Sequence, residues 1–396
     1  MLHIKNIPLA MCLLLLGCRK EYSFEKPPTP PVRPLTVRVL TTAYTQDVTA
    51  ARIYKSVYWI DSTLYPLEAM ANQQTFTQGI AVYNNQVVVA GCYTTDNSLH
   101  DAMPCYWLNG KRYDLPTNGG KYKPCWLTET LGIAIAHNSI YILGIIDDKP
   151  IVWKIYNGKV QIIQLPYPKN WDGSDSPYYL DFSITASDNT ILLSGMYSNF
   201  STIKKQNIWS PVFWEIDAQN NITSTTPENE PNYTGGSVRS CASFGNNIYA
   251  IGLCNLIINN NGVLSPCIWT RVGRLPLAFP VNDINEFLDV EVDNTGNIHV
   301  LAHMKSYSRQ IYTINPQGQL ISKTAIPLAA DATNVYSTCI SVNQYGSALG
   351  VAYPYPLPRK TEFFAIKNNI FIPLRFNFQH SNAAYWITDI KLVQMQ

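Results

Sequence analysis

The chain carries little charge. Only 14% of its 396 residues are Asp, Glu, Lys or Arg, the formal net charge is +2, and no basic run exceeds two residues. Attraction to nucleic acid or to an anionic membrane surface depends on concentrated positive charge. The composition therefore predicts neither a nucleic-acid partner nor a membrane surface held by charge.

A long hydrophobic run is also missing. The apolar stretch at residues 7–16 follows Lys5 and is too short to span a bilayer as a permanent helix, which takes about 20 residues. A positive start with a short apolar core predicts a secretory signal peptide. The stretch ends in LLGC (residues 15–18), which resembles a bacterial lipobox. We expect residues 1–17 to be removed and Cys18 to be lipidated; the alternative is an ordinary signal peptide with an incidental cysteine.

The segment after Cys18 indicates where the protein is held. Residues 19–21 (RKE) resemble the short charged signal that follows the lipidated cysteine in Bacteroidetes surface lipoproteins. Residues 25–34 (EKPPTPPVRP) predict an extended polyproline II spacer. Residues 18–34 would thus form a lipidated linker and residues 35–396 the folded domain. We expect a monomeric outer-membrane lipoprotein at the cell surface, or otherwise on the periplasmic face, that touches the membrane only through its lipid anchor.

Motifs for catalysis and metal binding are absent from the sequence too. It contains no nucleophile elbow, no phosphate-binding glycine loop and no compact Ser, His and Asp arrangement. His299 and His303 are four residues apart, which suits a helix, whereas the local pattern is that of a strand. We therefore expect no zinc or other metal and no cofactor.

What the sequence does have is an internal repeat. Residues 104–111 (PCYWLNGK) place a Trp at the end of a β-forming run, and related runs end at Trp59, Trp153, Trp214 and Trp269, with weaker copies ending at Tyr312 and Phe364. These aromatic residues are 43 to 61 positions apart, with a mean of about 51, which is near the longer propeller repeats.

Each repeat contains two hairpin signals. Residues 80–91 hold two β-rich runs around Asn84 and Asn85, and residues 151–165 hold two runs around an Asn-Gly turn at 157–158. Asn and Gly accept the positive φ angles that tight hairpin turns demand. Two hairpins make four antiparallel strands, and such units arranged radially form an all-β protein of the β-propeller type.

The number of repeats and the chain ends predict how the ring closes. Residues 35–396 number 362, and division by the mean repeat of about 51 gives about seven four-stranded blades, with six or eight as alternatives. One strand candidate, 36–44, precedes Trp59, and another, 386–393, is left over at the end. We expect the last strand to become the innermost strand of the first blade, which removes exposed edges.

The repeats resemble those of bacterial, Bacteroidetes-type β-propeller lipoproteins with Trp-Xaa-Asn-Gly-type repeats, and more loosely those of kelch-like propellers. The resemblance covers nearly the whole mature chain. It implies a fold without a function, because the kelch Gly-Gly pair is missing: Gly91, Gly195 and Gly252 are each followed by another residue type. The Gly-His and Trp-Asp signatures of WD repeats are missing as well.

The repeated tryptophans have two interpretations. Aromatic faces can stack on sugars, but one large aromatic residue in each blade also fills the same pocket between blades. Because the five tryptophans recur regularly, we expect them to belong to the core and look for ligand contacts elsewhere.

Loop lengths predict a ligand-binding face. In a propeller, the connections from second to third strands and from blade to blade emerge on one face, and the hairpin turns on the other. The former are long here, and long loops often carry function; we call that side the long-loop face. The ligand-binding residues predicted on it are Trp126, Trp171, Tyr178, Tyr179, Asp181, Trp209, Arg239, Asp289 and Trp386.

Three of these residues start innermost strands and are expected to ring the mouth of the central channel. They are Asp181, Arg239 and Asp289. Aromatic residues beside a few polar groups suit a glycan or peptide site. The alternative for each residue is that it only packs a loop onto the domain.

Two cysteine pairs are candidates for disulfides. Cys92 and Cys105 are 13 positions apart, as are Cys254 and Cys267, and each pair is expected to lie on the second and third strands of one blade. Neighbouring strands allow a disulfide where the geometry fits. Buried thiols are the equal alternative.

Two functions from different classes are compatible with these features. The favoured one is a non-catalytic lipoprotein that binds a glycan or an envelope protein through the long-loop face. The other is a glycan-degrading hydrolase or lyase with carboxylates at the channel mouth, since propeller enzymes assemble their acids from separate blades. A third, a scaffold in an envelope assembly, would show an exposed apolar patch.

The lipobox generates a direct prediction. Cys18→Ala removes the acylated sulfur and should release the protein from membranes, because several acyl chains supply the anchoring free energy. Membrane fractionation of the wild type and the variant measures this. Unchanged membrane attachment of the variant would contradict the lipoprotein assignment.

Overall fold

The computed structural model shows an all-β chain over the part that it describes. Contacts gather Val37–Met395 into one compact unit. The described residues are 36–46, 54–94, 102–121, 132–147, 149–168, 179–187, 190–201, 206–227, 233–258, 261–326, 337–343, 346–353, 360–367, 370–374 and 384–395. The expected signal peptide, Cys18 and the proline-rich linker lie outside these ranges. Within them, no helix is long and apolar enough to cross a membrane.

The described strands pair into seven sheets, and pairing mostly follows chain order. The first three sheets are β29(Ala384–Met395)-β1(Thr36–Gln46)-β2(Tyr54–Ile60)-β3(Thr63–Pro66), β4(Thr75–Tyr83)-β5(Gln86–Thr94)-β6(Ala102–Leu108)-β7(Lys111–Asp114) and β8(Ile133–Ala136)-β9(Ser139–Ile146)-β10(Lys149–Tyr156)-β11(Lys159–Gln164). The next two are β12(Tyr179–Ser187)-β13(Thr190–Ser201)-β14(Gln206–Ile216)-β15(Ile222–Thr225) and β16(Tyr233–Gly236)-β18(Asn247–Ile258)-β19(Asn261–Thr270)-β20(Gly273–Arg274), where β17(Ser240–Phe244) also pairs with β18. The last two are β21(Ile284–Val292)-β22(Ile298–Met304)-β23(Arg309–Ile314)-β24(Leu320–Ala325) and β25(Ser337–Asn343)-β26(Gly346–Tyr353)-β27(Lys360–Lys367)-β28(Ile370–Leu374).

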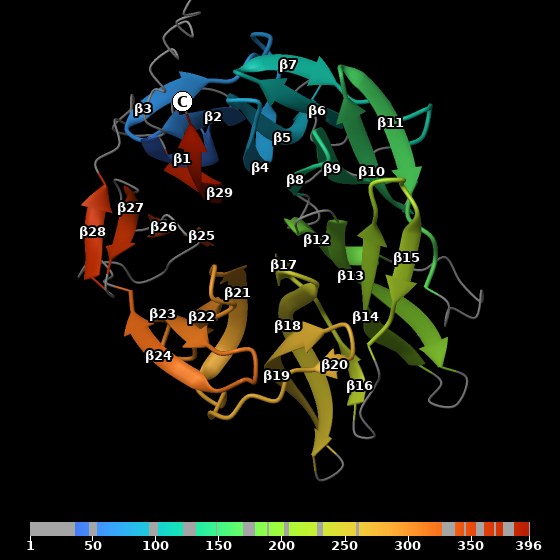
Figure 1. Cartoon of the computed structure of the whole chain (residues 1–396), viewed down its shortest axis with the longest axis vertical. Coiled ribbons are helices and arrows are strands. Elements are labelled where there is room, and N and C mark those ends of the chain that lie inside the picture. Colours follow the sequence, from blue (N-terminus) through green and yellow to red (C-terminus); the bar gives the residue numbers. More distant parts are fainter. Residues whose placement is uncertain are drawn as a thin grey trace, which may run out of the picture. The chain divides into compact units, whose positions relative to one another are not determined.

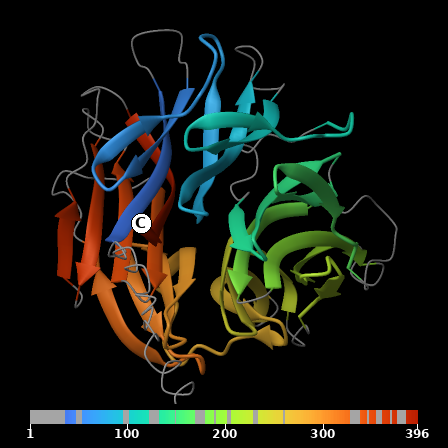
Figure 2. The ribbon, with the colours of Figure 1, turned by 45° about the horizontal axis from the view of Figure 1, so that its top comes forward.

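The sheets follow one another around a ring. Their innermost strands, β29, β4, β8, β12, β17, β21 and β25, contact one another in this order, and β25 contacts β29 (Figure 1). The predicted β-propeller is therefore confirmed. The predicted closure is confirmed as well, because β29 from the end of the chain pairs with β1 from its start. Figure 2 shows this sheet tilted, with a red strand beside the blue ones.

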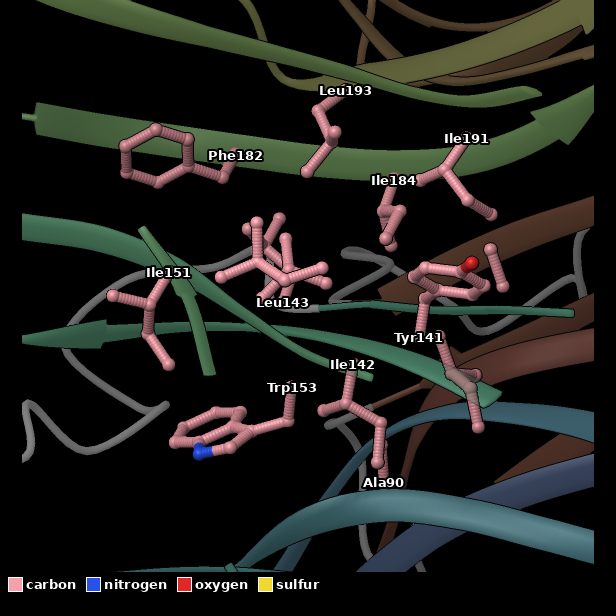
Figure 3. Close-up of a cluster of buried hydrophobic side chains, with 14 of the residues drawn as sticks. Ala90, Tyr141, Ile142, Leu143, Ile151, Trp153, Phe182, Ile184, Ile191 and Leu193 are labelled. Carbon is pink, nitrogen blue, oxygen red and sulfur yellow. The ribbon is translucent and has the colours of Figure 1, made fainter. Parts of the chain in front are cut away.

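The repeated tryptophans fill the cores, as predicted. Trp59, Trp107, Trp153, Trp214 and Trp269 are each at most 2% exposed. Figure 3 shows the Trp153 ring beside Ile142 and Ile151, within a cluster that continues to Leu193 on the neighbouring sheet. Burial of an indole on this scale contributes several kcal/mol of hydrophobic free energy, about 25 cal/mol for each Å² removed from water.

Each indole also needs a partner for its N–H group. The Nε1 atoms of Trp107, Trp153 and Trp214 donate to backbone carbonyls, and each of the three N···O distances is 2.9 Å. In each case the acceptor lies in the connection that leads into the same sheet from the preceding one, as Pro116 does for Trp153. The tryptophan thus fastens the incoming connection to the third strand of its sheet.

A glycine on the second strand makes room for the ring. A Cβ added to Gly144 would collide with the ring of Trp153, and one added to Gly195 would lie 3.0 Å from the ring of Trp214. In both sheets the glycine is diagonal to the tryptophan across the strand pair. The recurrence of glycine in the second strand therefore has a steric cause.

The predicted hairpin turns are also present. Asn84 and Asn85 between β4 and β5 have φ angles of 50° and 59°, and Asn157 and Gly158 between β10 and β11 have φ angles of 48° and 74°. Two successive positive φ angles match the twist of a two-residue hairpin. Asn and Gly tolerate this conformation at lower cost than other residues do.

The packing of Trp153 predicts a large effect of truncation. Trp153→Ala leaves a cavity and removes the indole bond to Pro116, so we expect a loss of about 3–5 kcal/mol in the free energy of unfolding. Tyr156→Ala, three residues along the same strand at a side chain 48% exposed, is the control and should cost less than about 1 kcal/mol. Denaturant unfolding measures both. Equal losses would contradict the proposed role of the indole.

Candidate functional site

Arg239 lies at a break in the innermost strand of its sheet. Strands β16 and β17 both pair with β18, and residues 237–239 separate them. The backbone is still held there, because the Arg239 N–H donates to the carbonyl of Ile251 at 2.8 Å. The Arg239 side chain reaches the next sheet, where Nη1 lies 2.8 Å from Oε2 of Glu286.

Glu286 belongs to a row of polar residues across that next sheet. It is directly opposite His303, and His303 is directly opposite Arg309, so the three side chains lie on one face of β21, β22 and β23. Nδ1 of His303 is 3.2 Å from Oε1 of Glu286. We call Arg239, Glu286, His303 and Arg309 the mouth cluster. It lies at the long-loop face, because β21 and β23 begin there and β22 ends there.

Irregular pairing sets the direction of Glu286. The register of β21 on β22 shifts between Ile284 and Glu286 and again between Phe287 and Asp289. Such bulges redirect side chains and are common next to functional sites. A regular strand would put Ile284 and Glu286 on one face. The shift between them leaves Ile284 and Phe287 together in the core against the preceding sheet and puts Glu286 on the opposite face, with His303 and Arg309.

The mouth cluster combines accessible and buried charge. The side chains of Arg239 and Glu286 are 33% and 32% exposed, that of His303 is 16% exposed, and Arg309 as a whole is 6% exposed. Burial lowers the pKa of Arg309 to about 10, Glu286 opposes this, and the charge of Arg239 adds to the lowering.

An exposed aromatic ring adjoins the cluster. Tyr307, in the short connection between β22 and β23, is 66% exposed, and its ring centroid lies 6.2 Å from that of His303. Its φ angle is 64°, an uncommon value for an aromatic residue. Backbone strain of this kind collects at binding sites.

Asp289 lies deeper than predicted. Its Oδ1 accepts a hydrogen bond from Oγ of Ser240 at 2.8 Å, and its Oδ2 accepts one from the N–H of Ile340 at 3.0 Å. It therefore joins three successive innermost strands, β17, β21 and β25. Burial raises its pKa, against which these hydrogen bonds act. The structure thus gives Asp289 a structural role, which its expected position at the mouth did not suggest.

A second charged group lies on the axial side of the innermost strands. Nζ of Lys391 on β29 is 2.7 Å from Oε1 of Glu291 on β21 and 3.9 Å from Oδ1 of Asp389. Strand β25 lies between β21 and β29 in the ring. The ion pair between Lys391 and Glu291 therefore crosses the side of β25 that faces the central axis of the ring. We call Glu291, Asp389 and Lys391, with Asp289 beside them, the axial cluster.

Burial dominates the electrostatics of the axial cluster. It raises the pKa of Glu291 to about 7 and that of Asp389 to about 6, and in both cases Lys391 opposes the rise. Burial alone would lower the pKa of Lys391, but Glu291 and Asp389 raise it. The lysine is therefore charged at any pH at which the protein functions, and Glu291 titrates near neutral pH.

The other predicted site residues divide into three groups. Trp209 on β14 is partly buried, and its backbone lies beside Gly235 of β16. The structure describes only the backbone of Tyr179, Asp181 and Trp386, on β12, β12 and β29. Trp126, Trp171 and Tyr178 lie outside the described residues, so their ligand-binding role remains a prediction.

Sequence reasoning missed most of both clusters. Glu286, Arg309, Glu291 and Lys391 were not singled out, and His303 was considered only as a metal ligand. Glu286, His303 and Arg309 come together through strand register, which depends on bulges that no local motif announces. The one usable signal is the hairpin pattern of 284–304, which pairs Glu286 with His303 only when the register shift between Phe287 and Asp289 is known.

The histidines and the other acidic groups do not form a metal site in the described part of the chain. His299 pairs with Asp293 at 2.9 Å near the hairpin turn, whereas His303 pairs with Glu286 at the opposite end of β22. Among the described residues, no three His, Cys, Asp or Glu side chains are grouped as metal ligands.

The cysteine pairs differ in their placement. Cys105 is opposite Gly91, so Cys92 and Cys105 point to opposite faces of their sheet, and both are buried thiols. That geometry disfavours the predicted bond. Cys254 and Cys267 lie on the same face in diagonal positions and share one buried cluster. A disulfide between them remains a prediction.

Comparison with known proteins supports the fold alone. No known family profile matches the chain, and no curated protein matches it. The β-propeller domain of the Trilobed protease from Pyrococcus furiosus, described as having an open velcro topology, matches with a TM-score of 0.51 at 9% identity, over 85% of this chain and 92% of that one. In contrast to an open ring, β29 and β1 here share a sheet.

Two prolyl peptidase structures also match over part of their length. A post-proline cleaving enzyme from Rickettsia typhi has a TM-score of 0.49 at 10% identity, over 87% of this chain and 53% of that one. A structure from a study of two prolyl endopeptidases has a TM-score of 0.48 at 10% identity, over 86% and 50%. The chain spans about half the length of each. The protein is a β-propeller, a fold that does not by itself define a function.

The raised pKa of Glu291 predicts a pH dependence of stability. The folded-state pKa of about 7 exceeds the ordinary value of 4.5, so the folded protein binds more protons between these values and loses stability as pH rises through 7. Between pH 6 and 8 Glu291 should account for a loss of about 1 kcal/mol, so the total loss should be smaller by about that amount in Glu291→Gln. Thermal unfolding at both pH values measures it. Glu215→Gln, which alters the ion pair with Arg271, is the control, and an equal effect there would contradict the assignment.

Proposed function

We propose that this protein is a membrane-anchored surface lipoprotein whose propeller binds a glycan or an envelope protein through the long-loop face. The observation that carries the proposal is the mouth cluster with the exposed ring of Tyr307 beside it. The anchor rests on the resemblance of residues 15–18 to a lipobox and on the proline-rich spacer that follows. Of the two ligand classes, the chemistry of the cluster favours a glycan.

The mouth cluster offers what a sugar site requires. Arg239 and Glu286 supply donors and acceptors in an accessible place, and Tyr307 supplies an apolar ring face. Binding sites commonly combine an aromatic or apolar surface with a few fixed polar groups. The two polar side chains are held by their mutual ion pair and by the bulged strand, so binding would cost little side-chain entropy.

A scaffold protein of an envelope assembly would present a contiguous apolar patch for its partner. Exposed large hydrophobic residues in the described part are dispersed, for example Met70 between β3 and β4, Val272 between β19 and β20, and Leu320 on β24. Single exposed apolar residues are normal, whereas a contiguous patch would indicate a large protein interface. The accessible group at the long-loop face is the mouth cluster with Tyr307, which is polar and aromatic. This surface supports binding of a small polar ligand.

A glycan-degrading enzyme is the second candidate, and one observation favours it. Glu291 and Asp389 have pKa values of about 7 and about 6, a range suited to general acid and base catalysis. Glu291, however, is five residues along β21 from Glu286, or about 16 Å in an extended strand. It therefore lies toward the hairpin turns, away from the long-loop mouth, and its partner is Lys391. This separation favours binding over catalysis.

Glycan-array binding of the full-length Cys18→Ala protein tests the proposal. We expect binding of one glycan class without product in mass spectrometry of the bound ligand, and a loss of at least about tenfold in affinity for Tyr307→Ala because a stacking surface is removed. Tyr156→Ala, an exposed tyrosine at a hairpin turn, should bind as the wild type does.

The other outcomes separate the candidates. Products that disappear in Glu291→Gln would replace the binding function with the enzymatic one. Equal losses in the two tyrosine variants would contradict the choice of face. Binding weakened by Trp126→Ala or Trp171→Ala would extend the site to the remaining predicted residues of the long-loop face.

A further inference from the structure

The end of the hairpin formed by β18 and β19 leaves one edge of β19 open. These strands have 12 and 10 residues, compared with 7 and 6 in β22 and β23 of the next sheet. Figure 1 shows the hairpin extending outward from the ring. The short strand β20 pairs only with Trp269 and Thr270, and the Leu275 N–H adds one bond to the carbonyl of Ile268. Within the described part of the chain, no strand pairs with the outer edge of residues 261–267.

A longer fourth strand covers the equivalent edge in other sheets. In the sheet of β4 to β7, the N–H of Leu115 donates to the carbonyl of Pro104 at 2.9 Å. Pro266 holds the same place in β19, three residues before the tryptophan. Beyond β20, however, the chain leaves its sheet, and the N–H of Ala278 donates to the carbonyl of Gly318, between β23 and β24, at 2.9 Å. The fourth strand is therefore too short to reach the start of β19.

The open edge presents backbone hydrogen-bonding groups and apolar side chains. Backbone groups of successive residues in an antiparallel strand point to opposite sides. Because the Ile268 carbonyl points to β20, the backbone groups of Pro266, Leu264 and Gly262 point to the open side. Proline supplies a carbonyl without an N–H, and the other two residues supply both groups. The side chains of Val263 and Leu264, on opposite faces of the strand, are 41% and 67% exposed.

The edge also lacks the charges that usually protect an exposed strand. Residues 240–270, which include β17, β18 and β19, contain no Asp, Glu, Lys or Arg. Natural edges are commonly blocked by charged side chains, by proline or by a covering segment. Pro266 removes one N–H group but recurs in other third strands, so it belongs to the repeat. An open, uncharged edge is a template for another strand.

We propose that this edge, residues 262–266, pairs with the same edge of a second copy of the chain. The pairing is antiparallel about a two-fold axis at Leu264, so that one surface serves both partners. This interaction goes beyond the proposed ligand binding, and it replaces the expected monomer with a dimer.

The bonding pattern of the edge is complementary to itself. With the axis at Leu264, the two Leu264 residues exchange N–H···O bonds, and each Gly262 N–H donates to the Pro266 carbonyl of the other copy. Gly262 has no side chain that could collide with the proline ring opposite it. Pairing ends before Ile268, whose carbonyl already binds Leu275. Two copies also bring no like charges together, which would destabilise a cross-strand contact.

Five residues from each copy make a small contact. Stable complexes bury about 1,200–2,000 Å², and an edge of this length buries less. We therefore expect a reversible dimer whose population rises with protein concentration.

Analytical ultracentrifugation of the full-length Cys18→Ala protein, from micromolar to millimolar concentration, tests the proposal. We expect a monomer–dimer equilibrium whose association constant falls roughly tenfold or more in Leu264→Lys, because two like charges would then lie directly opposite each other. Leu264→Pro removes half of the N–H donors of the contact and should weaken it too. Leu320→Lys, at an exposed leucine on β24, is the control and should dimerise as the wild type does. Circular dichroism checks that each variant folds.

A cysteine at the axis tests the register. In Leu264→Cys the two introduced residues would have Cα atoms about 5.5 Å apart, a separation that a disulfide can span. Oxidised glutathione should therefore give a covalent dimer on a non-reducing gel. Val272→Cys, at a side chain 81% exposed between β19 and β20, is the control and should stay monomeric on the gel, as should the wild type.

Three results would overturn the proposal. A protein that is monomeric at every concentration has no such contact. A dimer that Leu264→Lys leaves intact, or that Leu320→Lys weakens equally, forms through another surface. Equal cross-linking of Leu264→Cys and Val272→Cys would contradict the two-fold register. None of these results affects the proposed ligand binding, because the mouth cluster belongs to one copy.

Discussion

The structure depends on buried indoles whose N–H groups bind backbone carbonyls, and in three sheets the acceptor belongs to the connection that enters the sheet. The N–H groups of Trp107, Trp153 and Trp214 reach Glu68, Pro116 and Pro166, so the third strand of each of these sheets holds the chain that arrives from the preceding sheet. One tryptophan therefore both buries apolar surface in its sheet and fixes the position of the connection that enters the sheet. An indole N–H that is buried without a hydrogen-bond partner costs free energy, so these bonds offset the cost of burying the ring.

The innermost strands are joined by a second set of polar contacts. Asp289 accepts from the N–H of Ile340 on the next innermost strand, and Asp389 accepts from that of Ile80 in the same way. These carboxylates are occupied in holding neighbouring sheets together. Glu286, by contrast, faces an accessible arginine and a histidine at the long-loop face. The sequence alone does not distinguish the carboxylates that join sheets from Glu286. They differ in the groups that their side chains contact in the fold.

The sequence predicts the parts of the fold that local chemistry determines. Trp153 and its glycine, the Asn-Gly turn at 157–158 and the strand left over at the end of the chain predict the repeat, the hairpins and the closure. The site is predictable only in part. Arg239 could be placed at the start of an innermost strand. The position of its partner Glu286 depends on the irregular register of β21 and on the angle between sheets, which are set by packing of the whole ring.

The irregularities of the innermost strands are the link between fold and function. Regular strands would point their side chains alternately into the cores on either side, leaving no polar group at the mouth. The break before β17 releases Arg239 from that pattern, and the shift between Ile284 and Glu286 keeps Ile284 and Phe287 in the core while Glu286 lies on the opposite face. Bulges weaken a sheet locally, so a bulge and a break that meet at one ion pair need a compensating use. The ligand binding that we propose for the long-loop face is such a use, and it leaves the tryptophan-anchored cores undisturbed.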